Sequence, residues 1–281
     1  AGFSVEDEYV SQLPRIERFT GEVRTFVVAD TTEGWCDALD GGLESLWNGT
    51  DVFFDVAKIR PKGSRLKTKG GRASGPGPLL EMITFIRNVF KDRQGKRLRD
   101  IDVHDICCMI GKIVQVGGVR RAAEISLSDL DSRAMRDCKS GNWYVGNVQR
   151  TMANNSAVYE EKPPIEEFME EWLALVKSKS GERGIFNRQS AYRHSPARRK
   201  WGKNKPGGNP CLEILLRAFQ FCNLTIVVAR PSDTVEDLKR KVRLATIFGK
   251  IQSLCTSFNY IRKAWKQNCE EERLLGVDIT G

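Results

Sequence analysis

Short apolar runs alternate with longer amphipathic segments along this chain of 281 residues. Runs rich in β-branched and aromatic residues predict strands over 24–30, 51–59, 123–129, 156–160 and 223–229. Apolar positions at helical spacing predict helices over 78–95, 102–118 and 165–181, and a long helical stretch over 234–265 that breaks near Ser257. Strands and helices in alternation predict an α/β fold with mostly parallel strands.

The ends of these helices carry the expected boundary residues. Gly95 follows the first helix after basic residues, as is typical of a helix C-terminus. Asp102 is a candidate N-cap for the second helix, and Pro163 and Pro164 precede the third. These boundaries support the assignment of the segments as helices.

Three loops rich in Gly, Lys and Arg interrupt the pattern, over 60–78, 116–123 and 198–210. At the carboxyl ends of parallel strands, such loops are natural phosphate sites. Gly117 and Gly118 allow close backbone approach, while Arg120 and Arg121 offer forked donors to phosphate or to base edges. The chain has no P-loop motif and no dinucleotide-binding glycine motif. The alternative for each single loop is a surface turn with solvated charge.

Charge and cysteine content narrow the class of protein. The net charge of +9 suits a polyanionic partner such as a nucleotide or nucleic acid. No apolar stretch reaches the roughly 18 residues of a membrane helix, and the first ten residues lack a signal-peptide core. Eight cysteines without a CxxC pair do not resemble a disulfide scaffold. We therefore expect a reduced, cytoplasmic protein with no membrane segment.

Two cysteines lie in the stretch NPCLEILLRAFQFCNLT, at positions 211 and 222. These two cysteines could be buried core residues, metal ligands, partners in a disulfide or reacting groups. Zinc is disfavoured because the chain has only two histidines, of which His104 lies in a helical pattern and is expected to be structural. Gly207, Gly208 and Pro210 precede Cys211 and predict a loop there. A cysteine at the tip of a loop is accessible, which favours a reactive role for Cys211. On an extended segment, Cys211 and Glu213 would point to one side.

The stretch NPCLEI followed by CNL resembles the finger loop of ribonucleotide reductases, most of all the adenosylcobalamin-dependent ribonucleoside-triphosphate reductases. Further segments resemble that family in the same order, so the resemblance spans nearly the whole chain: ADTTEGWCDAL (29–39), IRPKGSRLKTKGGRASGPGPL (59–79), GGVRRAAEISLSD (117–129), MANNSAV (152–158), ERGIFNR (182–188) and EEERLLGVDITG (270–281). Leu212 departs from the pattern, since the cobalamin-dependent enzymes often carry glycine there.

The resemblance implies catalytic roles in the finger loop, over 205–222. Cys211 would carry the thiyl radical that takes the ribose 3′ hydrogen. Glu213 would act as general base on the 3′-hydroxyl, and Asn209 would hydrogen-bond the ribose hydroxyls. Cys222 would be one of two thiols that reduce C2′ and end as a disulfide. The other six cysteines match no chemical position of the family, and helical spacing predicts that Cys107 and Cys108 are core residues.

The resemblance also implies an allosteric site for a deoxynucleoside triphosphate effector, formed by loops 60–78 and 116–123. Asp30 matches an effector-ribose ligand and Arg60 an effector-phosphate contact. The remaining matched positions are Ser74, Gly75, Gly117, Gly118, Arg120 and Arg121.

For the fold, the family implies a ten-stranded α/β barrel, of which residues 1–281 form a single segment, about the first half. The family's other reducing cysteine and its C-terminal cysteine pair are expected outside this segment. The implied cofactor is adenosylcobalamin, with no metal bound directly by this chain. The implied partners are a ribonucleoside triphosphate substrate, an external dithiol reductant, and the missing half of the barrel or a second copy.

Two functions from different classes stay open at this point. The chain can be the catalytic-loop segment of a reductase, as an excised fragment or a piece of a split enzyme. It can instead be a non-catalytic nucleotide-binding or assembly module descended from one. Asn209, Cys211, Glu213 and Cys222 occurring together favour the first, because a binding module has no need of all four.

Overall fold

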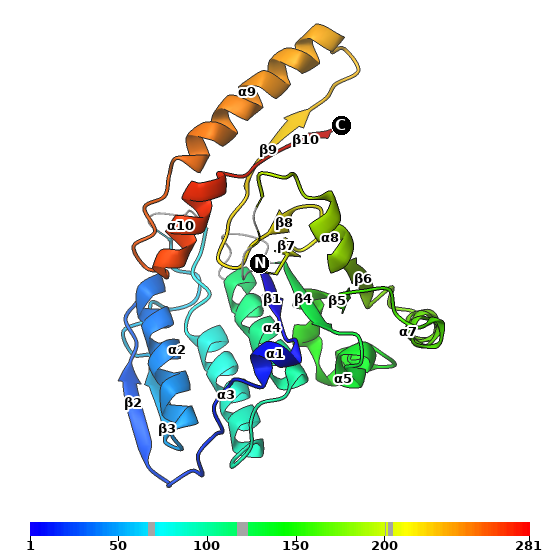
Figure 1. The fold of residues 1–281 in the computed structure, drawn as a ribbon. Helices are drawn as coiled ribbons and strands as arrows, with labels where there is room; N and C mark the ends of the chain where they lie inside the picture. Colours follow the sequence, from blue (N-terminus) through cyan, green and yellow to red (C-terminus); the bar gives the residue numbers. More distant parts are fainter. Residues whose placement is uncertain (67–70, 117–122, 200, 202–204) are drawn as a thin grey trace. The chain divides into compact units, whose positions relative to one another are not determined.

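The computed structural model describes residues 1–66, 71–116, 123–199, 201 and 205–281. The chain forms two compact units, Ala1–Asn187 and Arg188–Gly281. We call them the N-terminal unit and the C-terminal unit, and Figure 1 labels their helices and strands.

A parallel four-stranded sheet organises much of the N-terminal unit. Its strand order is β1 (Gly2–Ser4), β4 (Glu124–Asp129), β5 (Ala153–Tyr159) and β6 (Gly184–Asn187). β4 is buried at five of its six positions, so the sheet is covered on both faces there. This burial is typical of parallel sheets, whose connecting helices lie on the faces.

A second pair of parallel strands forms the other half of this unit. β2 (Val23–Val27) pairs with β3 (Asp51–Asp55), and α2 (Thr32–Trp47) connects them. Two further helices, α3 (Gly77–Asp92) and α4 (Asp100–Val116), pack into the same apolar core. Its centre contains Leu46 and Phe90, both fully buried, with Phe90 edge-on to the ring of Trp47.

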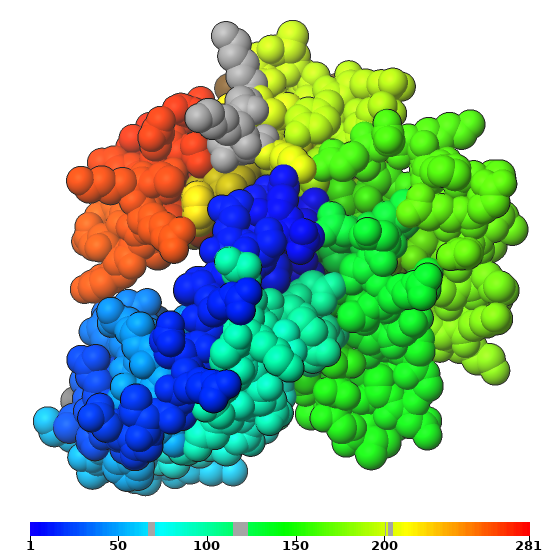
Figure 2. Space-filling view, turned by 60° about the horizontal axis from the view of Figure 1, so that its bottom comes forward, coloured from blue at the N-terminus to red at the C-terminus, as the bar shows by residue number. Residues whose placement is uncertain are grey.

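The N-terminal residues are anchored on this unit rather than free. α1 (Asp7–Val10) follows β1, and Val5 and Val10 pack into a buried cluster with Met135. Figure 2 shows this first segment, in blue, lying against the teal and green residues of the same unit. The remaining helical elements here are α5 (Arg133–Asp137), α6 (Trp143–Gly146), the 3-10 helix η1 (Val148–Met152) and α7 (Ile165–Ser178).

The C-terminal unit begins with α8 (Arg188–His194) and a short hairpin, β7 (Gly207–Gly208) with β8 (Leu215–Leu216). β9 (Asn223–Val228) then leads through α9 (Val235–Ser253) and α10 (Lys263–Glu272) to β10 (Leu275–Thr280), which is parallel to β9. A strand, a helical crossover and a parallel strand make this a βαβ unit. Its helix α9 begins with a capping box between Thr234 and Asp237.

The structure confirms the predicted α/β class with parallel strands. All five predicted strands are present, β5 beginning three residues before the predicted 156. The long helical stretch is indeed two helices with a break that includes Ser257. The N-cap assignment of Asp102 was wrong: α4 already begins at Asp100, and the Asp102 carboxylate accepts from the backbone N–H of Arg99 in its first turn. No helix in the described parts of the chain is long and apolar enough to cross a membrane.

Candidate active site

The finger hairpin presents Cys211 at its turn. We use this name for residues 207–216, where β7 and β8 are antiparallel. Asn209 closes the turn: its backbone N–H donates to Ile214 O at 3.3 Å, and its side-chain Oδ1 accepts from Ile214 N at 3.1 Å. Cys211 lies between these closing contacts and is exposed. The hairpin therefore holds a free thiol in a reachable position.

The turn is tighter than the extended segment expected from the sequence. Leu212 has φ +60°, in the left-handed region, and its N–H donates to Asn209 O at 2.9 Å. The expected alternation of Cys211 and Glu213 along an extended segment is therefore wrong. A glycine at 208 makes room for this turn, because a Cβ there would lie 2.8 Å from Leu212 Cδ2.

Asn209 and Glu213 nevertheless meet on one side of the turn. Asn209 Nδ2 donates to Glu213 Oε1 at 2.5 Å, and the Glu213 side chain is exposed. An amide donor thus lies beside a carboxylate acceptor, with the thiol of Cys211 between them in sequence. Such a pair can bind two adjacent hydroxyl groups, one as donor and one as acceptor.

Cys222 is half-buried directly before β9, in a different environment from Cys211. A Cβ added at Gly276 would lie 3.5 Å from Cys222 Sγ and 3.6 Å from Ile214 Cδ1. The Cys222 thiol and the side chain of Ile214 in the finger hairpin therefore both lie next to Gly276. Burial raises the pKa of the Cys222 thiol, the negative charge of Glu213 raises it further, and Arg199 opposes this rise. Glu213 is therefore close enough to act electrostatically on Cys222.

A buried ionic network lies at the base of the hairpin, and sequence reasoning missed it. Arg199 pairs with Glu272, and Gln220 donates to the same carboxylate. Although burial alone would raise the pKa of Glu272, these hydrogen bonds hold it below its usual value. Arg199 belongs to a loop that the sequence marks as basic, but its partner lies 73 positions further on, and no local pattern connects them.

Of the predicted effector residues, the structure brings Asp30 and Arg60 together. Arg60 Nε donates to Asp30 Oδ2 at 2.6 Å, and both side chains are about one-third exposed. Ser74 and Gly75 lie further along the same loop, where Gly75 has φ +72° and approaches the backbone of Lys62 so closely that a Cβ would lie 2.8 Å from its nitrogen. The other four predicted residues lie outside the described part of the chain: Gly117, Gly118, Arg120 and Arg121.

The other cysteines fall into two groups. Cys36 and Cys255 are exposed, while the remaining four are at least partly buried: Cys107, Cys108, Cys138 and Cys269. Burial raises the pKa of Cys107 to about 12, as the predicted core position implies. Buried His104 lies 3.5 Å from Cys108 Sγ, and burial lowers its pKa to about 4. Among the described residues, no group of three or more His, Cys, Asp or Glu side chains could hold a metal ion.

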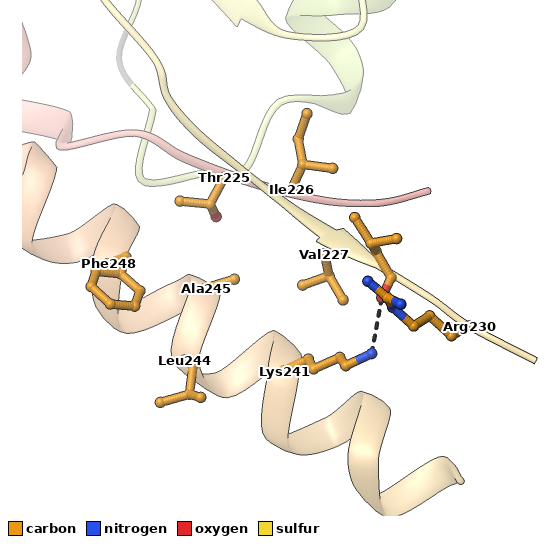
Figure 3. Close-up of a pocket in the computed structure, with 9 residues that line it drawn as sticks. Thr225, Ile226, Val227, Arg230, Lys241, Leu244, Ala245 and Phe248 are labelled. Atoms are coloured by element: carbon orange, nitrogen blue, oxygen red, sulfur yellow. Dashed lines mark hydrogen bonds between the residues drawn. The ribbon is translucent and has the colours of Figure 1, made fainter. Parts of the chain in front are cut away.

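An open apolar groove lies between β9 and α9. It has a volume of about 530 Å³ and is lined by Thr225 and Val227 of the strand and by Leu244, Ala245 and Phe248 of the helix. Figure 3 shows Lys241 reaching across one end, where its Nζ donates to Val228 O at 3.0 Å. None of the predicted site residues that the structure describes lines this groove.

Comparison with known proteins gives one family match and many related sequences. Residues 5–90 match the family described as B12-dependent ribonucleotide reductase, insertion domain. An adenosylcobalamin-dependent ribonucleoside-triphosphate reductase of Euglena gracilis is 30% identical over 263 residues, covering 91% of this chain and 35% of that protein. The enzyme of the same name from Lacticaseibacillus paracasei is 34% identical, covering 90% of this chain and 34% of that protein.

A solved structure agrees in fold. The crystal structure of a B12-dependent (class II) ribonucleotide reductase superimposes with a TM-score of 0.78 at 24% identity, covering 99% of this chain and 43% of that one. The chain thus spans about one-third of the length of the curated relatives.

Proposed function

Because this chain belongs to the ribonucleotide reductase family and resembles its adenosylcobalamin-dependent members along nearly its whole length, we propose that it is the finger-loop segment of such a reductase. Its activity would be the reduction of ribonucleoside triphosphates to deoxyribonucleotides. The observation that carries this proposal is the finger hairpin, in which an exposed thiol lies, in sequence, between an amide and a carboxylate that are hydrogen-bonded to each other.

The proposed roles follow from the chemistry of each side chain. As a thiyl radical, Cys211 would take the hydrogen atom from C3′ of the ribose and become a thiol again. Glu213 would accept the 3′-hydroxyl proton, and Asn209 would donate to a ribose hydroxyl. Cys222 would give reducing equivalents to C2′ as the 2′-hydroxyl leaves as water, forming a disulfide with a second thiol that an external dithiol reductant restores.

Adenosylcobalamin is compatible with what the described residues offer. The cofactor carries its cobalt within its own ring, so no protein cluster of metal ligands is required. The chain has to present a thiol that can be reached from outside, and Cys211 is exposed at a turn. When bound, the cofactor would supply the oxidising equivalent that makes Cys211 a radical.

We further propose that this chain holds about the first half of a ten-stranded α/β barrel. The parallel sheet and the similarity to a class II reductase support this. The remaining strands would come from further reductase segments or from a second copy. Loops 60–78 and 116–123 would bind a deoxynucleoside triphosphate effector.

The effector site can be tested at Arg60, whose guanidinium pairs with Asp30 at the surface. A deoxynucleoside triphosphate should raise the melting temperature of the assembled enzyme. Arg60→Ala should weaken this rise, because a forked cation on a phosphate contributes roughly 1.5–3 kcal/mol. Lys58→Ala, which removes an exposed cation two positions away, is the matched control and should keep the full rise. Equal rises for the native protein and Arg60→Ala at subsaturating nucleotide would count against the assignment.

Turnover tests the function as a whole. The chain is combined with the reductase segments that its relatives contain outside the matched region, and is supplied with adenosylcobalamin, a dithiol and a ribonucleoside triphosphate. Deoxyribonucleotide should form with the native chain and with Cys255→Ser, which removes another exposed thiol. Cys211→Ser should form none. If the native assembly forms no product while it still binds the effector, the reductase proposal fails. The alternative function, a non-catalytic nucleotide-binding or assembly module, then takes its place.

A further inference from the structure

One buried ion pair connects the finger hairpin to the last turn of α10. Arg199 donates from Nε and Nη2 to the two carboxylate oxygens of Glu272, at 2.8 and 2.9 Å. Its third nitrogen, Nη1, donates to the carbonyl oxygen of Leu215 in β8 at 2.9 Å. The two charged side chains are only 10% and 8% exposed. Because a guanidinium is planar, three bonds in two directions fix β8 relative to Glu272.

Gln220 connects the same carboxylate to the backbone directly after β8. Its Nε2 donates to Glu272 Oε2 at 2.6 Å, and its Oε1 accepts from the backbone N–H of Arg217 at 2.9 Å. Leu215 follows Glu213 by two residues, and Gln220 precedes Cys222 by two. The network thus holds the segment between the proposed base, Glu213, and the proposed reducing thiol, Cys222, near both of its ends.

Aromatic contacts leave this network little room to move. The Arg199 guanidinium lies over the ring of Trp201, 4.3 Å from its centroid. Beside it, the ring of Phe221 stacks on Trp265 at 4.4 Å, and the Phe221 N–H donates to the buried Cys269 Sγ at 3.3 Å. Replacing a buried ion pair with apolar side chains of similar size is often neutral or stabilising, so this pair suits a role in geometry rather than in stability.

We propose that Arg199, Glu272 and Gln220 are positioning residues, which hold Glu213 at a set distance from Cys222 so that both can act on one ribose. The part of this inference that concerns the ribose rests on the proposed reductase function. The geometric part does not, and it can be measured on the chain by itself.

The measurement is the electrostatic coupling between Glu213 and Cys222. Thiolate is the form that reacts with iodoacetamide, and a neighbouring carboxylate suppresses it. Glu213→Gln should therefore speed alkylation of Cys222, read by peptide mass spectrometry at neutral pH, by roughly threefold for one charge acting through partly hydrated protein. In Arg199→Lys, which keeps the charge but loses the fork, Glu213→Gln should change the rate much less. Arg262→Lys, whose guanidinium lies over Phe219 outside the network, should keep the full ratio.

Alkylation of the buried Cys269 shows whether a variant has lost the local structure around the network. The expected result is that Cys269 stays unreacted while the coupling disappears in Arg199→Lys and in Glu272→Gln. An unchanged ratio in both variants would overturn the proposal, as would a native ratio of one. If both variants expose Cys269, the network is merely structural and the proposal also fails; if only one does, the other decides. No turnover is needed, so an inert reductase assay would leave this result independent.

Discussion

The two finger-loop cysteines differ because their surroundings differ. Cys211 is exposed in the hairpin turn, whereas Cys222 is half-buried beside the charge of Glu213. The side chains from Asn209 to Glu213 are close together in sequence, so they could be proposed as candidate site residues before the structure. Arg199 and Glu272 could not, since the cost of burying a charge depends on a partner that is distant in the chain.

Glu124 gives a pH-dependent prediction at the same scale. Its carboxyl group is buried against Gly111 of α4, where a Cβ would lie 2.7 Å from Glu124 Cδ, and burial raises its pKa from 4.5 to about 7. Between these two pH values the unfolded chain has lost this proton while the folded chain keeps it. Stability should therefore fall as pH rises from about 4.5 to about 7.

Glu124→Gln should lack this contribution, so the stability difference between the native chain and the variant should fall over that pH window. Urea unfolding midpoints at several pH values measure it. Both proteins keep His104, whose lowered pKa acts in the opposite direction and cancels in the difference. Two parallel midpoint curves would show that the Glu124 carboxyl is not buried as described.

At the scale of elements, periodicity identified most of the long segments but missed the 16-residue helix α2 and the short strands β1 and β6. β1 and β6 have three and four residues, and they exist because β4 and β5 offer them a pairing edge. The finger hairpin has only two residues in each strand, and Leu212 occupies a left-handed conformation that no propensity scale assigns to leucine. Contacts with Gly208 and Asn209 select it instead.

Leu212 therefore gives a prediction about the hairpin. Leu212→Gly relieves the left-handed strain of about 1 kcal/mol but adds a comparable entropy cost, so its stability should be close to native. Leu212→Val places a β-branched residue at φ +60° and should be about 1 kcal/mol or more below Leu212→Gly in free energy of unfolding. Urea denaturation of the three chains measures the order. Equal stability of the glycine and valine variants would contradict the turn geometry.

At the scale of the whole molecule, the βαβ unit leaves one face of its strands uncovered. Thr225 and Val227 face the groove beside α9, while Leu224, Ile226 and Val228 are 47%, 56% and 51% exposed. Parallel strands are normally covered on both faces, and an open apolar strand favours association. The sequence predicted β9 as an apolar strand of a parallel sheet. It could not predict which of its residues stay uncovered, because that depends on contacts with segments distant in the chain.

We expect the chain to self-associate through this face when no partner is present. Light scattering after size exclusion should show an apparent mass that rises with concentration. Ile226→Lys should reduce the rise, because it places a charge within the apolar face. Val145→Lys alters an apolar side chain that is 78% exposed on α6 in the N-terminal unit, and it should behave like the native chain. A monodisperse monomer at all concentrations would contradict the expectation.

The central claim is that Cys211 starts the reaction and Cys222 completes it. Exchange of the ribose 3′ hydrogen, followed with isotopically labelled ribonucleoside triphosphate in the reconstituted enzyme, separates the two steps. Cys211→Ser should abolish both exchange and deoxyribonucleotide formation. Cys222→Ser should retain activation at C3′ but end in release of the base, because no reducing equivalent reaches C2′. Native exchange or turnover by Cys211→Ser would contradict the reductase account of this chain.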